Sequence, residues 1–98
     1  MKKLYFDTPA EFEKLFSKKT REVTDGIVEG IETAIQEQKK SAMLFNIIFA
    51  TEEVSFEISL PKSEWVGALQ NCLDYYHEHS ETDLAIDCWK LLECAKLQ

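Results

Sequence analysis

The stretch that most constrains the fold runs from Met43 to Leu60, where apolar and polar side chains alternate on either side of a polar tip. A repeat of two residues is typical of a β-strand with one buried face, because successive side chains of a strand point to opposite sides. A two-residue tip at Thr51-Glu52 predicts a β-hairpin, and a tip at Glu52-Glu53 would shift the partners but keep the same faces. The pairs expected from the first tip are Phe49 with Val54, Ile47 with Phe56, Phe45 with Ile58 and Met43 with Leu60. The stretch therefore predicts a two-stranded antiparallel sheet with one strongly apolar face.

A long helix is predicted before the hairpin. Thr8 can cap it, Pro9 fits the first turn and Glu11 completes a capping box. The apolar residues that follow recur at helical spacing: Phe12, Leu15, Phe16, Val23, Ile27, Ile31, Ala34 and Ile35. We expect one long or kinked helix, and the alternative is a break near Thr24-Asp25-Gly26. The preceding trio Leu4-Tyr5-Phe6 is either a brief strand or a staple that packs on this helix.

Two more helices are predicted after the hairpin. Pro61-Lys62-Ser63-Glu64 opens the first, Thr82 is the expected cap of the second, and a turn centred on Ser80 makes them antiparallel. Counted outward from this turn, apolar positions match as Tyr76 with Leu84, Cys72 with Cys88 and Leu69 with Leu91. The whole chain, residues 1–98, is thus predicted as a single small α+β domain: a long N-terminal helix, the β-hairpin and a C-terminal helical hairpin, with the helices on the apolar face of the sheet.

Residues 64–97 resemble a UVR-type helical hairpin. Leu73-Asp74-Tyr75 and Ala85-Ile86-Asp87 carry the resemblance. Such hairpins serve as protein–protein contacts, but the resemblance transfers no function to this chain. They normally carry an arginine in the second helix, where this chain has Lys90, and no residue role is carried over.

The charge of the chain is acidic and unevenly spread. Residues 52–98 carry ten acids and three lysines, which accounts for the whole net charge of −7, while residues 1–51 carry eight acids and eight bases. Arg21 is the one arginine, a poor endowment for binding phosphate. We therefore expect no direct contact with nucleic acid. The acidic bias suits a basic protein partner, or it only keeps a small protein soluble.

The sequence predicts an intracellular, cytoplasmic protein with no membrane association. No apolar run approaches the about 18 residues of a membrane span. Lys2-Lys3 is followed by too short an apolar segment for a signal peptide. The three cysteines are odd in number and lack the density of a secreted disulfide scaffold.

No cofactor, metal or catalytic site is expected. The one metal-like set, Cys72, His77, His79 and Cys88, has no recognised zinc spacing, and the two cysteines fit a helix core better. Cys94 with either histidine could act as a nucleophile and its base only beside an oxyanion hole, and nothing in the sequence supplies one. Glu52-Glu53 at the hairpin tip and Asp83 with Asp87 on a polar helix face are expected as solvated charge, because acid–base work needs a desolvated member. We therefore predict that the protein is not an enzyme.

Two surfaces are candidates for binding. The second face of the hairpin is half apolar, and both strand edges are unpaired, which suits the addition of a strand from another chain. The small residues Gly26, Gly30 and Ala34 form a stripe that either packs closely on the chain's own sheet or forms a dimer seam. The full candidate surface comprises Leu44, Ile48, Ala50, Gly26, Gly30, Ala34, Glu57, Asp83 and Asp87.

The leading functional hypothesis is a small acidic protein that acts by binding another protein, with a basic protein or a second copy of itself as the partner. By analogy, such compact acidic α+β chains are frequent among phage and mobile-element inhibitors of host machinery. One alternative is an acidic mimic of nucleic acid that occupies a basic groove, and the least favoured alternative is an enzyme.

Overall fold

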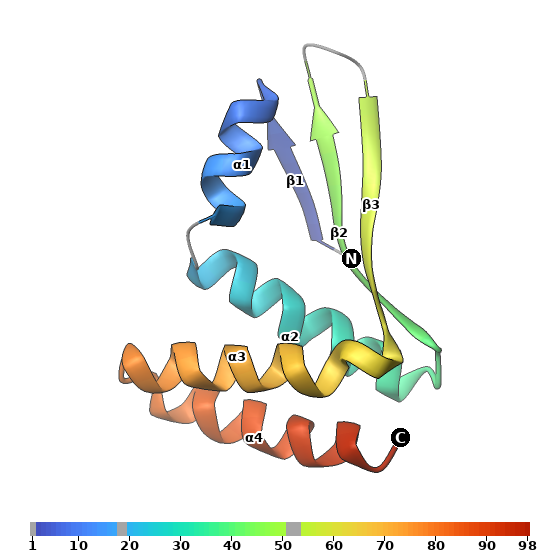
Figure 1. The fold of residues 1–98 in the computed structure, drawn as a ribbon, viewed down its shortest axis with the longest axis vertical. Helices are drawn as coiled ribbons and strands as arrows, with labels where there is room; N and C mark the ends of the chain where they lie inside the picture. The colour runs from blue at the N-terminus through green and yellow to red at the C-terminus, as the bar shows by residue number, and fades with distance from the viewer. Residues whose placement is uncertain (1, 18–19, 51–53) are drawn as a thin grey trace.

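The computed structural model describes residues 2–17, 20–50 and 54–98, and shows an α+β fold. The sheet occupies one end of the molecule, and three of the helices cross the other end (Figure 1). The elements in chain order are β1 (Lys2–Phe6), α1 (Pro9–Ser17), α2 (Arg21–Gln36), β2 (Ser41–Phe49), β3 (Val54–Pro61), a 3-10 turn η1 (Lys62–Glu64), α3 (Trp65–Glu78) and α4 (Thr82–Lys96).

The sheet has three strands, so the prediction of a two-stranded sheet was wrong. β2 lies in the centre, parallel to β1 and antiparallel to β3. The trio Leu4-Tyr5-Phe6 forms the extra strand, with Leu4 beside Ile47 and Tyr5 beside Ile48. Two helices separate β1 from its partner, and a strand of five residues has too short a pattern to reveal that pairing in the sequence.

The predicted hairpin register is confirmed for its first three pairs and wrong for the fourth. Phe49 pairs with Val54, Ile47 with Phe56 and Phe45 with Ile58. Leu60 then faces Ala42 instead of Met43, because the register shifts between Met43 and Phe45. Such a bulge adds one residue to one strand and reverses the faces beyond it. Leu44, the extra residue, therefore turns into the core.

The predicted long helix is two helices, and the break comes earlier than Thr24-Asp25-Gly26. Thr20 has an extended backbone, with φ −99° and ψ 158°, and its hydroxyl accepts a hydrogen bond from the backbone N–H of Val23. This is the geometry of a helix N-cap, so α2 starts at Arg21. Thr24 lies inside α2, where its hydroxyl donates to the carbonyl of Thr20 at 2.9 Å.

The small-residue stripe seats α2 on the sheet. A Cβ on Gly30 would lie 2.6 Å from Leu44 Cδ2 and 3.0 Å from the Met43 carbonyl oxygen. A Cβ on Gly26 would overlap the ring of Phe45. Gly26 and Ala34 are buried, and Gly30 is half-buried. The close-packing alternative is thus the one observed, and the stripe contacts β2 of its own chain.

The C-terminal helices form the predicted antiparallel hairpin. Ser80 has the positive φ of 56° that such a turn needs. Cys72 and Cys88 are both buried between the helices and α2. Thr82 is the first residue of α4 and not its cap, because the N-cap position is Glu81, whose side chain makes no capping bond.

One continuous core joins the two ends of the molecule. α2 packs on β2 with one side and on α3 and α4 with the other. The largest fully buried side chains are Trp65, Tyr76, Phe45, Ile31, Ile47, Leu69 and Cys88. Within the described ranges, no helix is both long and apolar enough to cross a bilayer.

Candidate functional site

The outer face of the sheet, which lies away from the helices, is less apolar than predicted. Leu44 was expected there, but it is only 5% exposed because the bulge turns it toward α2. Ile48 does lie on the outer face and is half-buried beside Tyr5. Ala50 and Glu57 are exposed. The apolar surplus on this face is therefore small, and it centres on Ile48 and Tyr5.

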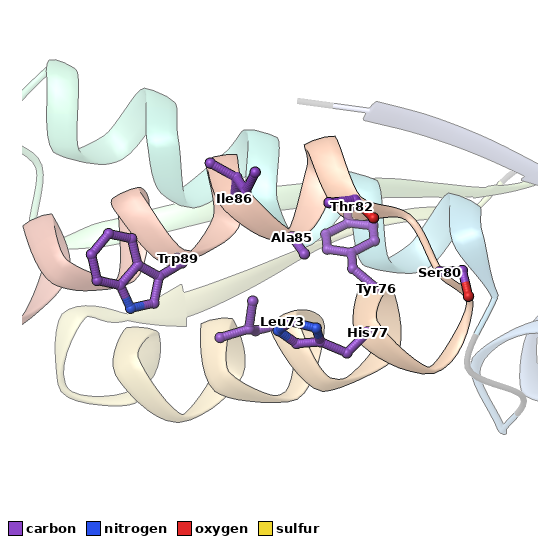
Figure 2. A pocket seen from close by; sticks show the side chains of 8 residues that line it. All are labelled: Leu73, Tyr76, His77, Ser80, Thr82, Ala85, Ile86 and Trp89. Atoms are coloured by element: carbon purple, nitrogen blue, oxygen red, sulfur yellow. The ribbon is translucent and has the colours of Figure 1, made fainter.

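A second apolar surface lies in a groove between α3 and α4, whose lining side chains are drawn in Figure 2. The volume of the groove is about 620 Å³. Its lining residues are Leu73, Tyr76, His77, Ser80, Thr82, Ala85, Ile86 and Trp89. We call this surface the α3–α4 groove.

Helical spacing brings these side chains together. Thr82, Ile86 and Trp89 recur at intervals of four and three residues, so they form one stripe along α4. Leu73 and His77 are four residues apart and form the facing stripe of α3. Figure 2 shows both stripes on the same side of the helical hairpin, with α2 and the sheet behind.

Two large apolar residues of the groove remain exposed. Ile86 is 48% exposed and Trp89 is 52% exposed, whereas Leu73 and Ala85 at the base are buried. Tryptophan is highly buried on average, so a half-exposed tryptophan beside an exposed isoleucine is typical of an interaction site.

The exposed charges of the two groove helices are mostly acidic, with Lys90 next to Trp89 as one exception. Asp83 and Asp87, two of the predicted surface residues, are exposed on α4 on either side of Ile86 in the sequence. Asp74 and Glu78 are exposed on α3 beside Leu73 and His77. Residues 64–98 carry seven acids and two lysines, so this half of the molecule attracts cations.

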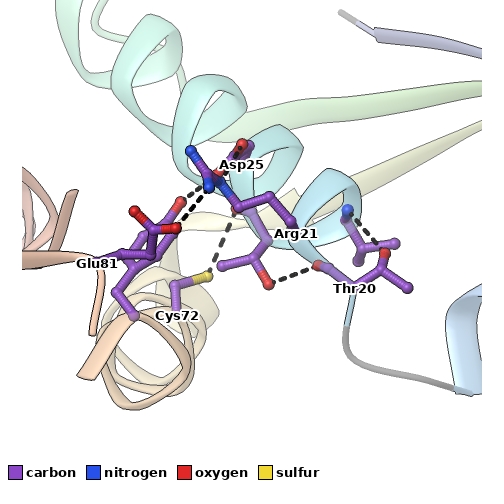
Figure 3. A network of polar contacts seen from close by, with 8 residues as sticks. Thr20, Arg21, Asp25, Cys72 and Glu81 are labelled. Carbon is purple, nitrogen blue, oxygen red and sulfur yellow. Dashed lines mark hydrogen bonds and ion pairs between the residues drawn. The ribbon is translucent and has the colours of Figure 1, made fainter. Parts of the chain in front are cut away.

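A polar cluster lies next to Tyr76, one of the groove's lining residues (Figure 3). The Arg21 guanidinium donates to Asp25 Oδ2 at 3.1 Å and to Glu81 Oε1 at 2.8 Å. The hydroxyl of Tyr76 donates to Asp25 Oδ1 at 2.6 Å. Burial and this hydrogen bond raise the pKa of Tyr76, so its hydroxyl stays protonated at neutral pH. The cluster ties α2 to the turn of the helical hairpin and holds the Tyr76 side of the groove in place.

The other titratable residues singled out in the sequence lie in separate environments, and Glu52 and Glu53 fall outside the described residues. Over the described parts of the chain, no three His, Cys, Asp or Glu side chains gather as a metal site would require. Cys72 and Cys88 are buried, and desolvation raises the pKa of Cys88 to about 11. His77 lines the groove. His79 stacks on Tyr75 with ring centroids 4.1 Å apart.

Ile86 and Trp89 are the site residues that sequence reasoning missed. The predicted helical hairpin turns Leu84, Cys88 and Leu91 of α4 toward α3, and Trp89 follows Cys88 directly in the sequence. The available signal is the width of that arc, because a helix packed on one side buries only part of its circumference. Trp89 lies at its margin and Ile86 lies beyond it.

Comparisons with known proteins give no match, whether with family models, curated proteins or solved structures. The resemblance of residues 64–97 to a UVR-type hairpin stays an expectation, and the site rests on the geometry of the chain itself.

Proposed function

We propose that this protein is a non-enzymatic binding module, and that its α3–α4 groove holds a basic amphipathic helix of another protein. The observation that carries the proposal is the apolar groove of about 620 Å³ in which Ile86 and Trp89 remain about half exposed, on two helices that also carry exposed acidic residues.

The apolar part of the groove fits the side chains of a helix. Helix-in-groove recognition uses residues spaced three and four apart on one side of the ligand helix. The groove lies between two antiparallel helices, and Leu73 and Ala85 close its base. Trp89, at one end of the groove (Figure 2), would be the main anchor, because tryptophan is enriched among the residues that dominate binding energy.

The acidic residues of the two helices select the charge of the partner. Asp74 and Glu78 on α3, and Asp83 and Asp87 on α4, would meet lysine or arginine on the polar face of the ligand helix. An arginine of the ligand could also stack on the ring of Trp89. Complementary charge speeds encounter and rejects acidic helices, which include a second copy of this hairpin.

The proposal is tested with a designed peptide of about five helical turns, with leucine on one face and lysine on the other. We expect it to bind and to shift the Trp89 fluorescence to shorter wavelength, because binding removes the indole from water. A peptide with the same leucine face and glutamate in place of lysine should not bind. Equal binding of both peptides would contradict the charge argument, and no binding of either would contradict the docking site.

Variants assign the binding to the groove. Trp89→Ala and Ile86→Ala should each lower the affinity for the lysine peptide by about tenfold or more, as measured by calorimetry. Tyr5→Ala is the matched control, because Tyr5 is also an exposed aromatic residue but lies on β1. Retained binding by Trp89→Ala would place the contact elsewhere. Competition by duplex DNA for the lysine peptide separates the alternative of a nucleic-acid mimic, since a mimic and DNA share their basic partners.

A further inference from the structure

The strand β3 is a long and unprotected sheet edge. It has eight residues, and across the described ranges no strand pairs with its outer side. Its one charged residue is Glu57, and its one proline, Pro61, is the last residue. The opposite edge, β1, has only five residues and carries an exposed lysine, Lys3, and both features discourage pairing. An edge like β3 therefore invites another strand.

The apolar inner face of the sheet continues to this edge and is only partly covered there. Val54 is 48% exposed and Phe56 is 40% exposed. Phe56 packs edge-on against Phe12 of α1 and is tilted against Phe49 of β2, with ring centroids 5.7 and 5.8 Å apart. Apolar surface is thus open to solvent at the same edge where backbone groups lack a strand partner.

We propose that two copies of the chain join through their β3 strands, which pair antiparallel about a twofold axis at Phe56. The two three-stranded sheets then form one continuous sheet of six strands. A symmetric contact uses the same patch on both copies, so the strand must be complementary to itself. This dimer is independent of the binding proposed for the α3–α4 groove.

The sequence of β3 selects the position of the axis. With the axis at Phe56, the two Phe56 side chains face each other, Val54 faces Ile58, and Ser55 faces Glu57. Opposed aromatic and aliphatic pairs stabilise an antiparallel sheet. An axis at Glu57 would oppose two carboxylates, which is destabilising. An axis at Ile58 would bring in Leu60, whose carbonyl already accepts a hydrogen bond from the Trp65 indole at 2.9 Å.

The distribution of charge favours a second copy at this edge. β2 carries no charged residue, and β3 carries only Glu57. The acidic helices α3 and α4 lie at the other end of the molecule (Figure 1). Two copies with a net charge of −7 each would thus meet along a strand that carries one charged residue per copy, and both α3–α4 grooves stay open.

Sedimentation of the full chain from about 10 µM to about 1 mM, a range that includes weak interfaces, tests the dimer. We expect a monomer–dimer equilibrium whose dissociation constant rises by about tenfold or more in Val54→Lys, which places a charge opposite Ile58. Ile48→Lys is the matched control, because Ile48 lies on the outer face of the central strand, and it should dimerise as the wild type does. Thermal unfolding of dilute Val54→Lys checks that the monomer is intact.

A wild type that stays monomeric over this range would overturn the proposal. Dimerisation lost in Ile48→Lys and kept in Val54→Lys would also overturn it, since the contact would then be the outer face.

Cysteine pairs test the register. In a Cys94→Ser background, a chain that carries both Ser55→Cys and Glu57→Cys should form disulfide-linked dimers on oxidation. Glu57→Cys with Ser59→Cys, which matches an axis at Ile58, should form far fewer. Equal cross-linking of the two pairs, or none in either, would contradict the axis at Phe56.

Discussion

At the scale of single residues, the three cysteines divide into two classes. Cys72 and Cys88 are buried, and Cys88 Sγ lies 3.4 Å from the carbonyl oxygen of Leu69. Burial raises the pKa of Cys88 to about 11, so little thiolate exists at neutral pH. The thiolate is the reactive form, and buried structural cysteines are inert. Cys94 is exposed on α4.

We therefore expect one fast-reacting thiol per native chain. A colorimetric thiol reagent should label Cys94 at once and reach the other two only as the chain unfolds. In Cys94→Ser, the fast phase should vanish. Fast labelling of Cys72 or Cys88 without denaturant would contradict the packing of the helical hairpin.

Tyr76 predicts a loss of stability at alkaline pH. Its pKa is raised by burial and by the hydrogen bond to Asp25, and that of Cys88 is raised by burial. Above pH about 9 for the cysteine and about 10 for the tyrosine, the unfolded chain loses these protons while the folded chain keeps them. The free energy of unfolding should therefore be steady near neutral pH and fall as the pH rises from about 9 to about 11.

Urea unfolding at a series of pH values measures this slope. Tyr76→Phe should lower the neutral stability by about 1 kcal/mol through the lost hydrogen bond and flatten the alkaline decline. If the free energy of unfolding fell just as steeply at alkaline pH in Tyr76→Phe, the fall would come from other titratable groups.

At the scale of elements, replacing a glycine by alanine should have opposite effects on stability in α2 and in α3. Alanine in place of a helical glycine gains about 0.5–1 kcal/mol of helix propensity. At Gly30 the added Cβ would lie 2.6 Å from Leu44 Cδ2, and such overpacking costs about 1–3 kcal/mol. At Gly67 the added Cβ would meet no atom within 4 Å.

Gly30→Ala should thus destabilise the protein and Gly67→Ala should stabilise it, as measured by the urea midpoint. The pair is well matched, because both changes add the same methyl group to a helix. Equal stabilisation by the two changes would mean that α2 does not rest on β2 at Gly30.

The sequence predicts the helices and strands better than the bulges, caps and breaks that interrupt them. The alternation in residues 43–60 is long enough to fix three strand pairs, and matched apolar positions fix the helical hairpin. The bulge at Leu44 could not be foreseen, because both Leu44 and Phe45 are apolar and either could face inward. The cap at Thr20 is hidden for a different reason: Val23 follows Phe16 by seven residues, which is two helical turns, so the helical spacing continues across the six polar residues between them.

The candidate site was predictable only in its charge. The acidic bias of residues 52–98 and the exposure of Asp83 and Asp87 were read from the sequence. The groove itself depends on how far α3 and α4 separate, which a pattern of apolar positions does not encode. Trp89 is apolar and helical wherever it points, so composition alone places it in the core.

At the scale of the whole molecule, α2 is the element that joins the sheet to the helical hairpin. The molecule measures 41 × 31 × 17 Å, so its two ends are far apart compared with its thickness. α2 contacts β2 on one side and α3 and α4 on the other. Ile31 is fully buried in α2. Because one core cluster includes residues from both ends, we expect the sheet and the helical hairpin to unfold together.

Native-state amide exchange tests this cooperativity at residue resolution. Ile31→Val removes one buried methyl group and should cost about 0.5–1.5 kcal/mol. If the two ends form one cooperative unit, the most protected amides of β2 and of α4 should lose that same opening free energy. Ile86→Val also removes one methyl group, but from a side chain that is 48% exposed. It should therefore leave the opening free energies of the β2 and α4 amides measurably unchanged. Loss of protection in α4 alone would show that the helical hairpin unfolds separately. In that case α2 would remain packed on the sheet while the α3–α4 groove unfolds.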